Sequence, residues 1–387
     1  MFINYLKTAF RNFYRQRGYS FINIAGLAIG FAAFILIMLF IMNEFSYDKF
    51  HKDHQRIYRI AVKGQMSGDF FDVAVSPAPL APALETEFPE VEKANRIRRT
   101  FQTSFFIYED VKYYEEGILF ADTGFFDVFS FPVIMGDPQS MLQDPFNIIL
   151  TEKTARKYFG DENPMGKVLR FNDQHNFKVS GVIRDIPENS HFKFPMLASW
   201  SSQQEMGNNH MLNSWGSMAY HTYVKLKPNA DPELFDEKIR NIIMDKLIAQ
   251  SGVSPEEFEG FQMKFNPYLQ AMTDIHLHSN KMAELGTNGD ISYVITFSLV
   301  ALFILLIACI NFMNLTTARS SKRAREVGVR KVHGAHRGML IRQFLVESVL
   351  LSLVGLLFAF LLVELAMPIF NDLTGKDLGI SFSNAGT

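Results

Sequence analysis

Three long apolar runs constrain what this chain can fold into. Residues 21–42 and 293–313 contain no formally charged side chain, and a helix of roughly 20 such residues is long enough to cross the hydrocarbon core of a bilayer. A third run, residues 348–363, lies between Glu347 and Glu364 and is extended by apolar neighbours on both sides. The runs predict an integral membrane protein with a large domain between its first and second spans.

The expected fold class is therefore an α-helical transmembrane protein with three spans and a large extracytoplasmic α+β domain of two lobes. The domain is inserted between spans 1 and 2. The predicted parts of the chain are a cytoplasmic amphipathic helix at 1–20, transmembrane helices at 21–42, 291–315 and 344–367, the large domain at 43–290, a cytoplasmic loop at 316–343 and an extracytoplasmic tail at 368–387.

The overall composition hides the membrane spans. A mean hydropathy of +0.03, 20% charged residues and a net charge of −2 resemble the values of a soluble protein, because the polar large domain dilutes the apolar runs. The near-neutral charge gives no reason to expect nucleic acid as a partner. The one cysteine, Cys309, lies in the second run, so no intramolecular disulfide stabilises the large domain.

The distribution of basic residues predicts the orientation, because cytoplasmic loops carry an excess of Lys and Arg. Four basic residues and no acid precede the first run, and eight basic residues against the single acid Glu326 lie between the second and third runs. We therefore expect the N-terminus and the loop at 316–343 in the cytoplasm and the large domain outside. The first run is too long for a signal peptide and lacks a small-residue cleavage site after it, so we expect the first span to be retained.

Two patterns near the N-terminus predict helix contacts. Apolar residues at helical spacing, with a basic stripe beside them, predict that residues 1–20 form a helix on the inner membrane surface; a helical flank of the first span is the alternative. In the span itself, Gly26, Gly30 and Ala33 form a face of small residues that permits close helix approach. We expect this face to pack within one bundle, with a dimer contact as the alternative.

Alternating and helical patterns in the large domain predict a mixed α/β fold. Strands are expected at 57–62, 222–226, 262–265 and 274–277. A helix with Leu80, Leu84 and Phe88 is expected after Pro79, and another after Pro232, where a proline is tolerated at a helix start, with Phe235, Ile239, Ile242, Ile243 and Leu247. We expect a membrane-proximal lobe at about 55–99 and 216–285, and a more β-rich lobe inserted at about 100–215.

Few side chains are candidates for metal binding or proton transfer. Asp274, His276 and His278 alternate in a predicted strand, which would place them on one face, and an H-x-H pair can ligate zinc. No third ligand stands at a recognisable spacing, so a polar strand face is the preferred interpretation and no metal is expected. Glu347 could relay protons, but its interfacial depth favours a packing or hydrogen-bonding role.

The sequence gives no positive case for an enzyme. It contains no G-x-x-x-x-G-K-[ST] phosphate-binding loop, no Cys/His metal cluster and no nucleophile elbow. No catalytic residue and no cofactor are therefore assigned.

Several phrases along the chain resemble one family. They are N-Y-L-K-T-A-F-R-N-F-Y-R-Q-R-G at 4–18, F-A-D-T-G-F-F-D-V-F-S-F at 120–131, L-T-E-K-T-A-R-K-Y-F-G at 150–160 and R-E-V-G-V-R-K-V-H-G-A at 325–335. In this order and with this topology, they resemble FtsX/MacB-type ABC transporter permeases, in the long form common in Bacteroidetes. The resemblance covers nearly all of the chain.

The resemblance implies the permease subunit of a mechanotransmitting ABC transporter in the bacterial inner membrane. A separate cytoplasmic ABC ATPase would hydrolyse ATP, and the permease would transmit its closure to the large domain to drive export or extrusion of a drug, an antimicrobial peptide or a lipoprotein. Other expected partners are membrane lipid, a second permease unit or half, and a periplasmic adaptor or hydrolase. The family unit has four spans and the long form repeats it, so with three runs and one copy we expect a fragment, or a partner chain that supplies the missing span.

The loop at 316–343 is the candidate site of coupling. Its residues alone are equally consistent with two interpretations. In the first, residues 325–332 form a short helix that ends at Gly334 and is bound by an ATPase. In the second, the basic residues only set the topology and bind anionic lipid. The resemblance favours coupling. The residues that it marks are Arg325, Glu326, Val327, Gly328, Val329, Arg330, Lys331, Gly334 and Ala335.

Two other functions are compatible with the sequence. One is a cell-division-type regulator that activates a cell-wall hydrolase, as in another branch of the same family. The other is a membrane-anchored ligand sensor, which would be expected to carry a signalling domain inside the cell, where this sequence has only a short basic loop.

Overall fold

The computed structural model describes residues 17–379, apart from 101, 208, 261–262, 319–323, 325–326, 330 and 333–335. The chain divides into two compact units, a helical unit formed by Met1–Phe45 with Ile291–Thr387 and a large domain, Ser46–Asp290. Each unit is described by itself.

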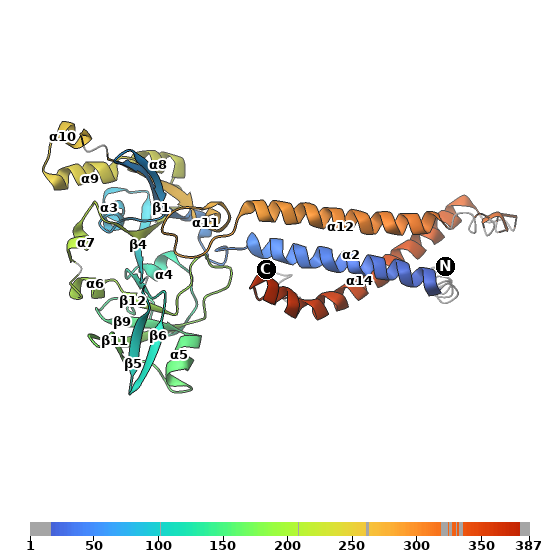
Figure 1. The fold of residues 1–387 in the computed structure, drawn as a ribbon, viewed down its shortest axis with the longest axis horizontal. Coiled ribbons are helices and arrows are strands. Elements are labelled where there is room, and N and C mark those ends of the chain that lie inside the picture. Colours follow the sequence, from blue (N-terminus) through green and yellow to red (C-terminus); the bar gives the residue numbers. More distant parts are fainter. Residues whose placement is uncertain are drawn as a thin grey trace. The chain divides into compact units, whose positions relative to one another are not determined.

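Three long helices make up the described part of the helical unit, and they contain the three predicted apolar runs. They are α2 (Arg17–Glu44), α12 (Ile291–Thr317) and α14 (Arg337–Thr374), and each is long and apolar enough to cross a membrane. Helix α2 packs along both of the others, so it is the central helix of the three (Figure 1). Many Leu, Ile and Phe side chains on these helices are exposed, which suits contact with lipid.

The large domain is built on a mixed sheet of 14 strands. The strands of its main path, in spatial order, are β14 (Lys264–Ala271), β1 (Ile57–Met66), β13 (Met218–Leu226), β4 (Val91–Arg99), β7 (Leu119–Ala121), β12 (Met196–Ser199), β9 (Asn147–Thr151), β11 (His175–Ile183), β10 (Val168–Phe171), β5 (Ser104–Tyr108) and β6 (Val111–Glu115). Outside this path, β2 (Asp69–Val73) pairs with β1, β3 (Ser76–Pro77) with β13, and β8 (Val133–Met135) with β11. Two of the pairs, β9 with β11 and β7 with β12, are parallel.

Short helices surround this sheet (Figure 1). They are η1 (His54–Arg56), α3 (Leu80–Glu87), α4 (Phe125–Val128), α5 (Glu152–Phe159), α6 (Ser201–Glu205), α7 (Asn209–Asn213), α8 (Pro232–Ile239), α9 (Ile242–Ser251), α10 (Pro255–Glu259) and α11 (Met272–His278). Local sequence explains several helix starts. Asp231 caps α8 by accepting hydrogen bonds from the backbone of Glu233 and Leu234, and the Ser254 hydroxyl and Glu257 form a capping box at α10.

Three large apolar clusters form most of the core of the described large domain, and a smaller one surrounds Trp200 and Tyr220. One, with α3, α8 and α9, covers the face of β1 that carries Ile60 and Val62. The second lies on the opposite face, where Ile57 packs with a group of phenylalanines that includes Phe125 and Phe129. The third lies within residues 106–198. The second cluster contains residues of both predicted lobes, and one sheet runs through both, so the division into two lobes and its boundaries stay a prediction.

The structure confirms the predicted α/β character and the helix that begins after Pro79, and it corrects two details. The helix expected to carry Phe235 to Leu247 is two helices, α8 and α9. The apolar pattern crosses the break because Phe235, Ile239, Ile242 and Ile243 all enter one cluster. The strand expected at 274–277 is wrong, since these residues belong to helix α11.

Candidate functional site

A row of polar side chains lies buried on one face of β1 and β13. Arg59 of β1 and Tyr223 of β13 are directly opposite each other in the antiparallel ladder, and both are fully buried. His221 and Lys225 stand two residues to either side of Tyr223, so they share its face. Buried polar groups of this kind need partners, and two segments of the large domain supply them.

The first connecting segment, residues 46–53, follows α2 in the sequence. Its Asp48 is fully buried, and its carboxylate lies 2.9 Å from Nδ1 of His191 and accepts a hydrogen bond of 3.1 Å from the His191 backbone N–H. On the other side of the ring, Nε2 of His191 is 2.7 Å from the hydroxyl of Tyr223. The tautomer of the His191 ring decides which of Nε2 and the tyrosine hydroxyl donates in this bond. A line of hydrogen bonds thus joins the first connecting segment to β13.

Other residues of the first connecting segment are held as firmly. Nδ1 of His51 accepts a hydrogen bond of 3.0 Å from the Ser130 backbone. Asp53 lies 2.7 Å from Nζ of Lys225 and 2.8 Å from Nη2 of Arg56. Hydrogen bonds from Lys225 and Arg56 lower the pKa of Asp53 to about 2, so its carboxylate stays charged and paired.

The second connecting segment, residues 279–288, precedes α12 in the sequence. Its Glu284 accepts two hydrogen bonds from the Arg59 guanidinium, one of 3.0 Å from Nη2 to Oε1 and one from Nη1 to Oε2. Nη2 of Arg59 also donates to Oε1 of Gln270 at 2.6 Å and to Oγ of Ser279 at 3.0 Å. A bidentate pair with these further acceptors is the arrangement that a buried guanidinium requires. The second connecting segment is therefore bound to β1.

The two connecting segments meet the same two strands. Tyr223 and Arg59 lie opposite each other and interact, so Asp48, His191, Tyr223, Arg59 and the partly buried Glu284 form one polar network, which we call the root network. Burial raises the pKa of Tyr223, and the positive charge of Arg59 opposes this rise. The network ties the segments that follow α2 and precede α12 to β1 and β13, which lie second and third from one end of the main strand path.

Acidification is expected to destabilise the large domain. Burial lowers the pKa of His51 and of His221 from 6.5 to about 3. Because these folded-state values lie below the unfolded value, the neutral imidazoles contribute stability that is fully present above pH 6.5 and is lost as the pH falls toward 3. Each histidine changes the free energy of unfolding by about 1.4 kcal/mol per pH unit within this window. The unfolding temperature of the full chain, followed by tryptophan fluorescence, should fall steadily with pH.

Substitution separates this effect from general acid sensitivity. His221→Gln should give a shallower dependence of the unfolding temperature on pH, whereas replacing the exposed His210 by Gln should leave it unchanged. Both tryptophans, Trp200 and Trp215, lie in the large domain, so they report its unfolding. A flat pH profile in the unsubstituted chain would contradict the assignment.

The predicted H-x-H face does not exist in the structure. In α11, Asp274, His276 and His278 follow helical geometry, so His276 points away from the other two. Its ring is buried and stacks on Tyr47 with a centroid distance of 3.3 Å. Met272 and Ile275 are both buried in the phenylalanine cluster. Their separation of three residues is a helical spacing, and burying both side chains favours the helix over the alternating strand pattern. Among the described residues, no group of three His, Cys, Asp or Glu is placed to hold a metal ion.

The small residues of α2 face its neighbour α12. A Cβ added at Gly30 would lie 2.5 Å from Cβ of Ala308, and one added at Gly26 would lie 2.9 Å from the side-chain nitrogen of Asn311. A larger side chain at Gly30 would push the two helices apart, whereas one at Gly26 would displace the Asn311 side chain. Ala33 lies on the same side by helical spacing, and the contact is internal to one chain. Glu347 is a buried residue of α14.

The predicted coupling residues are described only in part. Val327, Gly328, Val329, Lys331 and Val332 are helical. Arg325, Glu326, Arg330, Gly334 and Ala335 lie outside the described residues, as does the amphipathic stretch before Arg17, so the coupling site stays a prediction.

The root network was not predicted from the sequence. One signal for it was present, because Arg59 interrupts the apolar residues at 57–62, the first part of the strand Ile57–Met66. Its partner Glu284 is 225 residues away, and no local pattern connects the two positions.

Comparison with known proteins finds two family regions in the chain. Residues 20–242 match the MacB-like periplasmic core domain, and residues 298–386 match the FtsX-like permease C-terminal region. A macrolide export ATP-binding/permease protein MacB from Neisseria gonorrhoeae is 26% identical over 224 residues, which is 57% of this chain and 30% of that protein. An uncharacterized ABC transporter permease, YknZ, from Bacillus subtilis is 24% identical over 208 residues, which is 54% of this chain and 45% of that protein.

The fold is also similar to that of a solved structure. It is a domain of a putative permease protein from Porphyromonas gingivalis, which aligns with a TM-score of 0.50 and 26% identity over 64% of this chain and 98% of that one. The curated relatives are longer than the part matched here: the chain covers 30% of the MacB protein and 45% of YknZ.

Proposed function

Because this chain belongs to the family of FtsX/MacB-type ABC transporter permeases, we propose that it transmits the movement of a separate cytoplasmic ATPase to its large domain. In this proposal the chain hydrolyses no ATP itself. The ATPase binds the loop between α12 and α14, the membrane helices shift, and the large domain outside the membrane changes position to drive export. The location is the bacterial cytoplasmic membrane.

The root network is the observation that carries this proposal. The segment after α2 and the segment before α12 both enter the same face of β1 and β13. In this proposal, a displacement of either connecting segment reaches the sheet through Asp48 or Glu284, because both carboxylates contact residues that lie on or against β1 and β13. Separating a buried ion pair costs several kcal/mol, so a small displacement would move the domain instead of breaking the contact.

Export is the class of activity that the relatives support. The Neisseria gonorrhoeae relative is named a macrolide export ATP-binding/permease protein, and we propose export or extrusion here, with a drug, an antimicrobial peptide or a lipoprotein as the substrate class. A second permease unit and a periplasmic adaptor are proposed partners. The helical residues 327–329 and 331–332 support a short helix in the loop that an ATPase contacts.

Thiol labelling tests the orientation on which the proposal depends. In a Cys309→Ser background, a cysteine at Asn229, in the large domain, should react with an impermeant maleimide added to intact spheroplasts. A cysteine at His333, in the basic loop, should react only after the membrane is permeabilised, because the basic residues retain that loop in the cytoplasm. Labelling of the second site in intact spheroplasts would overturn the orientation and the proposed ATPase contact with it.

A further inference from the structure

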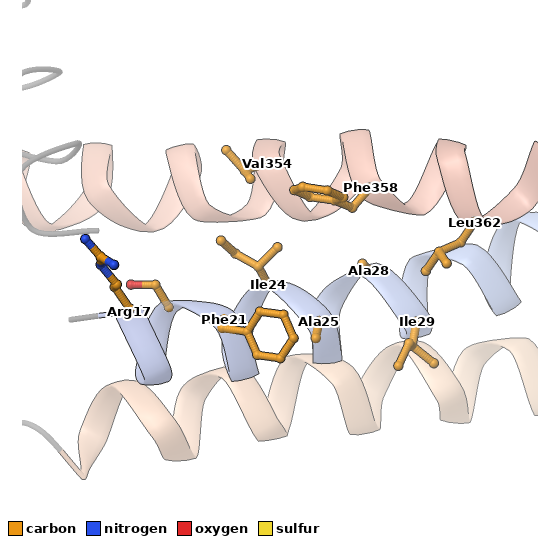
Figure 2. A pocket seen from close by; sticks show the side chains of 10 residues that line it. Arg17, Phe21, Ile24, Ala25, Ala28, Ile29, Val354, Phe358 and Leu362 are labelled. Carbon is orange, nitrogen blue, oxygen red and sulfur yellow. The ribbon is translucent and has the colours of Figure 1, made fainter. Parts of the chain in front are cut away.

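An apolar groove runs between α2 and α14 on the surface of the helical unit (Figure 2). Its volume is about 780 Å³. The floor is α2, where the small side chains of Ala25 and Ala28 leave room that larger residues would fill. One wall is a row of α14 residues four positions apart, Val354, Phe358 and Leu362.

The groove differs from the close helix seam beside it. At that seam, a Cβ added at Gly355 of α14 would lie 3.0 Å from Cβ of Leu27, so the two helices are in contact there. Phe21 and Ile29, at the groove, remain 73% and 64% exposed. The groove is therefore an unfilled depression next to a tightly packed line, and its surface is almost entirely apolar.

Its polar groups are confined to one end. Arg17 and Ser20 line the groove in the first turn of α2, and all its other lining residues are apolar (Figure 2). Arg17 stands just before the apolar stretch that begins at Ser20, at the depth where a membrane helix meets the head groups. The groove therefore suits an occupant that is apolar along its length and carries a negative charge at the end next to the guanidinium.

The length of the groove fits one leaflet of a bilayer. From Ser20 to Ile29 the helix rises about 14 Å at 1.5 Å per residue, and half of the ~30 Å hydrocarbon core is about 15 Å. A second helix in the same position would continue across the whole membrane, whereas an acyl chain ends at the midplane. The position of the charge and the length of the apolar part both match a phospholipid.

We propose that this groove binds one acyl chain of an anionic phospholipid, whose phosphate pairs with Arg17. The lipid would lie in the leaflet on the Arg17 side and fill the space between the central helix α2 and α14. The site requires only that these helices span a membrane, so it is independent of coupling to an ATPase.

A tryptophan reporter in the groove tests this proposal. Phe358→Trp is introduced into the full chain, and the variant is reconstituted in nanodiscs of unlabelled phosphatidylcholine. The nanodiscs contain a minor fraction of one of two brominated lipids, either phosphatidylglycerol or phosphatidylcholine. Bromine quenches only a tryptophan in contact with the acyl chain. The signal of Trp200 and Trp215 is measured in the chain without the reporter and subtracted. We expect roughly fivefold preferential quenching by the brominated anionic lipid, which is the preference that one interfacial arginine provides.

Matched variants show whether the preference belongs to the groove. Phe303→Trp places the same reporter at a position on α12 that is 59% exposed and outside the groove, and it should show no preference. Arg17→Gln should abolish the preference at Phe358→Trp while quenching continues. Ala25→Leu, which fills the floor and keeps Arg17, should reduce quenching by both lipids at Phe358→Trp but not at Phe303→Trp.

Three results would overturn the proposal. Equal quenching by both lipids at Phe358→Trp would mean an ordinary lipid-facing surface. The same preference at Phe303→Trp would mean a general enrichment of anionic lipid around the protein. Protection of Phe358→Trp from both lipids would mean that protein, such as a second copy of the chain, covers the groove. None of these results bears on the orientation or on ATPase binding, which the labelling experiment tests separately.

Discussion

Replacing Arg59 by methionine is expected to lower the free energy of unfolding of the large domain by about 3–5 kcal/mol. The guanidinium is fully buried and pairs with Glu284, whose side chain is 13% exposed. Methionine fills a similar volume but leaves the carboxylate of Glu284 without its cation, together with the side-chain oxygens of Gln270 and Ser279 that lose a donor. Urea unfolding of the full chain in detergent, followed by tryptophan fluorescence, measures the loss.

A second variant and a control identify the cause. Adding Glu284→Gln to Arg59→Met removes the stranded charge, so the double variant should recover part of the stability. Arg170→Met removes an exposed arginine, which lies 3.2 Å from Asp173 with both side chains more than half exposed, and should change stability by less than about 1 kcal/mol. If Arg59→Met costs no more than Arg170→Met, the root network does not hold the connecting segments.

Changes in the basic loop are expected to abolish ATPase binding while the large domain stays folded. Reversing the charge in Arg330→Glu places a carboxylate where a cation is expected to meet the partner, and an unfavourable charge contact of this kind costs several kcal/mol. Because about 1.4 kcal/mol of binding free energy corresponds to a tenfold change in affinity, we expect at least a tenfold loss of the ATPase that co-purifies with the chain. Gly334→Val should have a similar effect, because Gly334 is predicted to end the coupling helix with a positive φ, and a β-branched residue in that conformation costs about 1–3 kcal/mol.

The control for the loop is a pair of nearby charges. Neutralising Lys322 and Arg323 together removes two cations just before the predicted coupling helix, and it should alter lipid contacts with little effect on co-purification. Protease resistance of the large domain should be the same in all variants. Should Arg330→Glu and Gly334→Val retain the ATPase as well as the unsubstituted chain does, the loop serves only to fix topology.

The sequence predicts the membrane helices well because each one is marked by a long run of consecutive apolar residues. Apolar runs without charges leave few alternatives to a spanning helix, and α2, α12 and α14 contain the runs from which they were predicted. Short elements in the large domain are harder to predict. Residues 274–277 alternate like a strand, but Met272 and Ile275 are buried at helical spacing, and tertiary packing decides between the two patterns.

The candidate site is less visible in the sequence because it is assembled from distant segments. Asp48 and His191 are 143 residues apart, and Arg59 and Glu284 are 225 residues apart. A charged residue in an apolar strand signals that a partner must exist, but only the register of β1 with β13 places Arg59 opposite Tyr223. The groove exists because particular faces of α2 and α14 meet. The hydropathy of the two runs does not determine which faces these are.

Hydrogen exchange of the connecting segments tests most directly whether the chain transmits movement from an ATPase to the large domain. The chain and its ATP-binding subunit are reconstituted together in nanodiscs, and amide exchange is compared with and without ATP. Exchange in residues 46–53 and 279–288 should change when ATP is added to the unsubstituted complex, and should not change with Arg330→Glu. Continued ATP hydrolysis with unchanged exchange in both segments of the unsubstituted complex would contradict transmission through the root network.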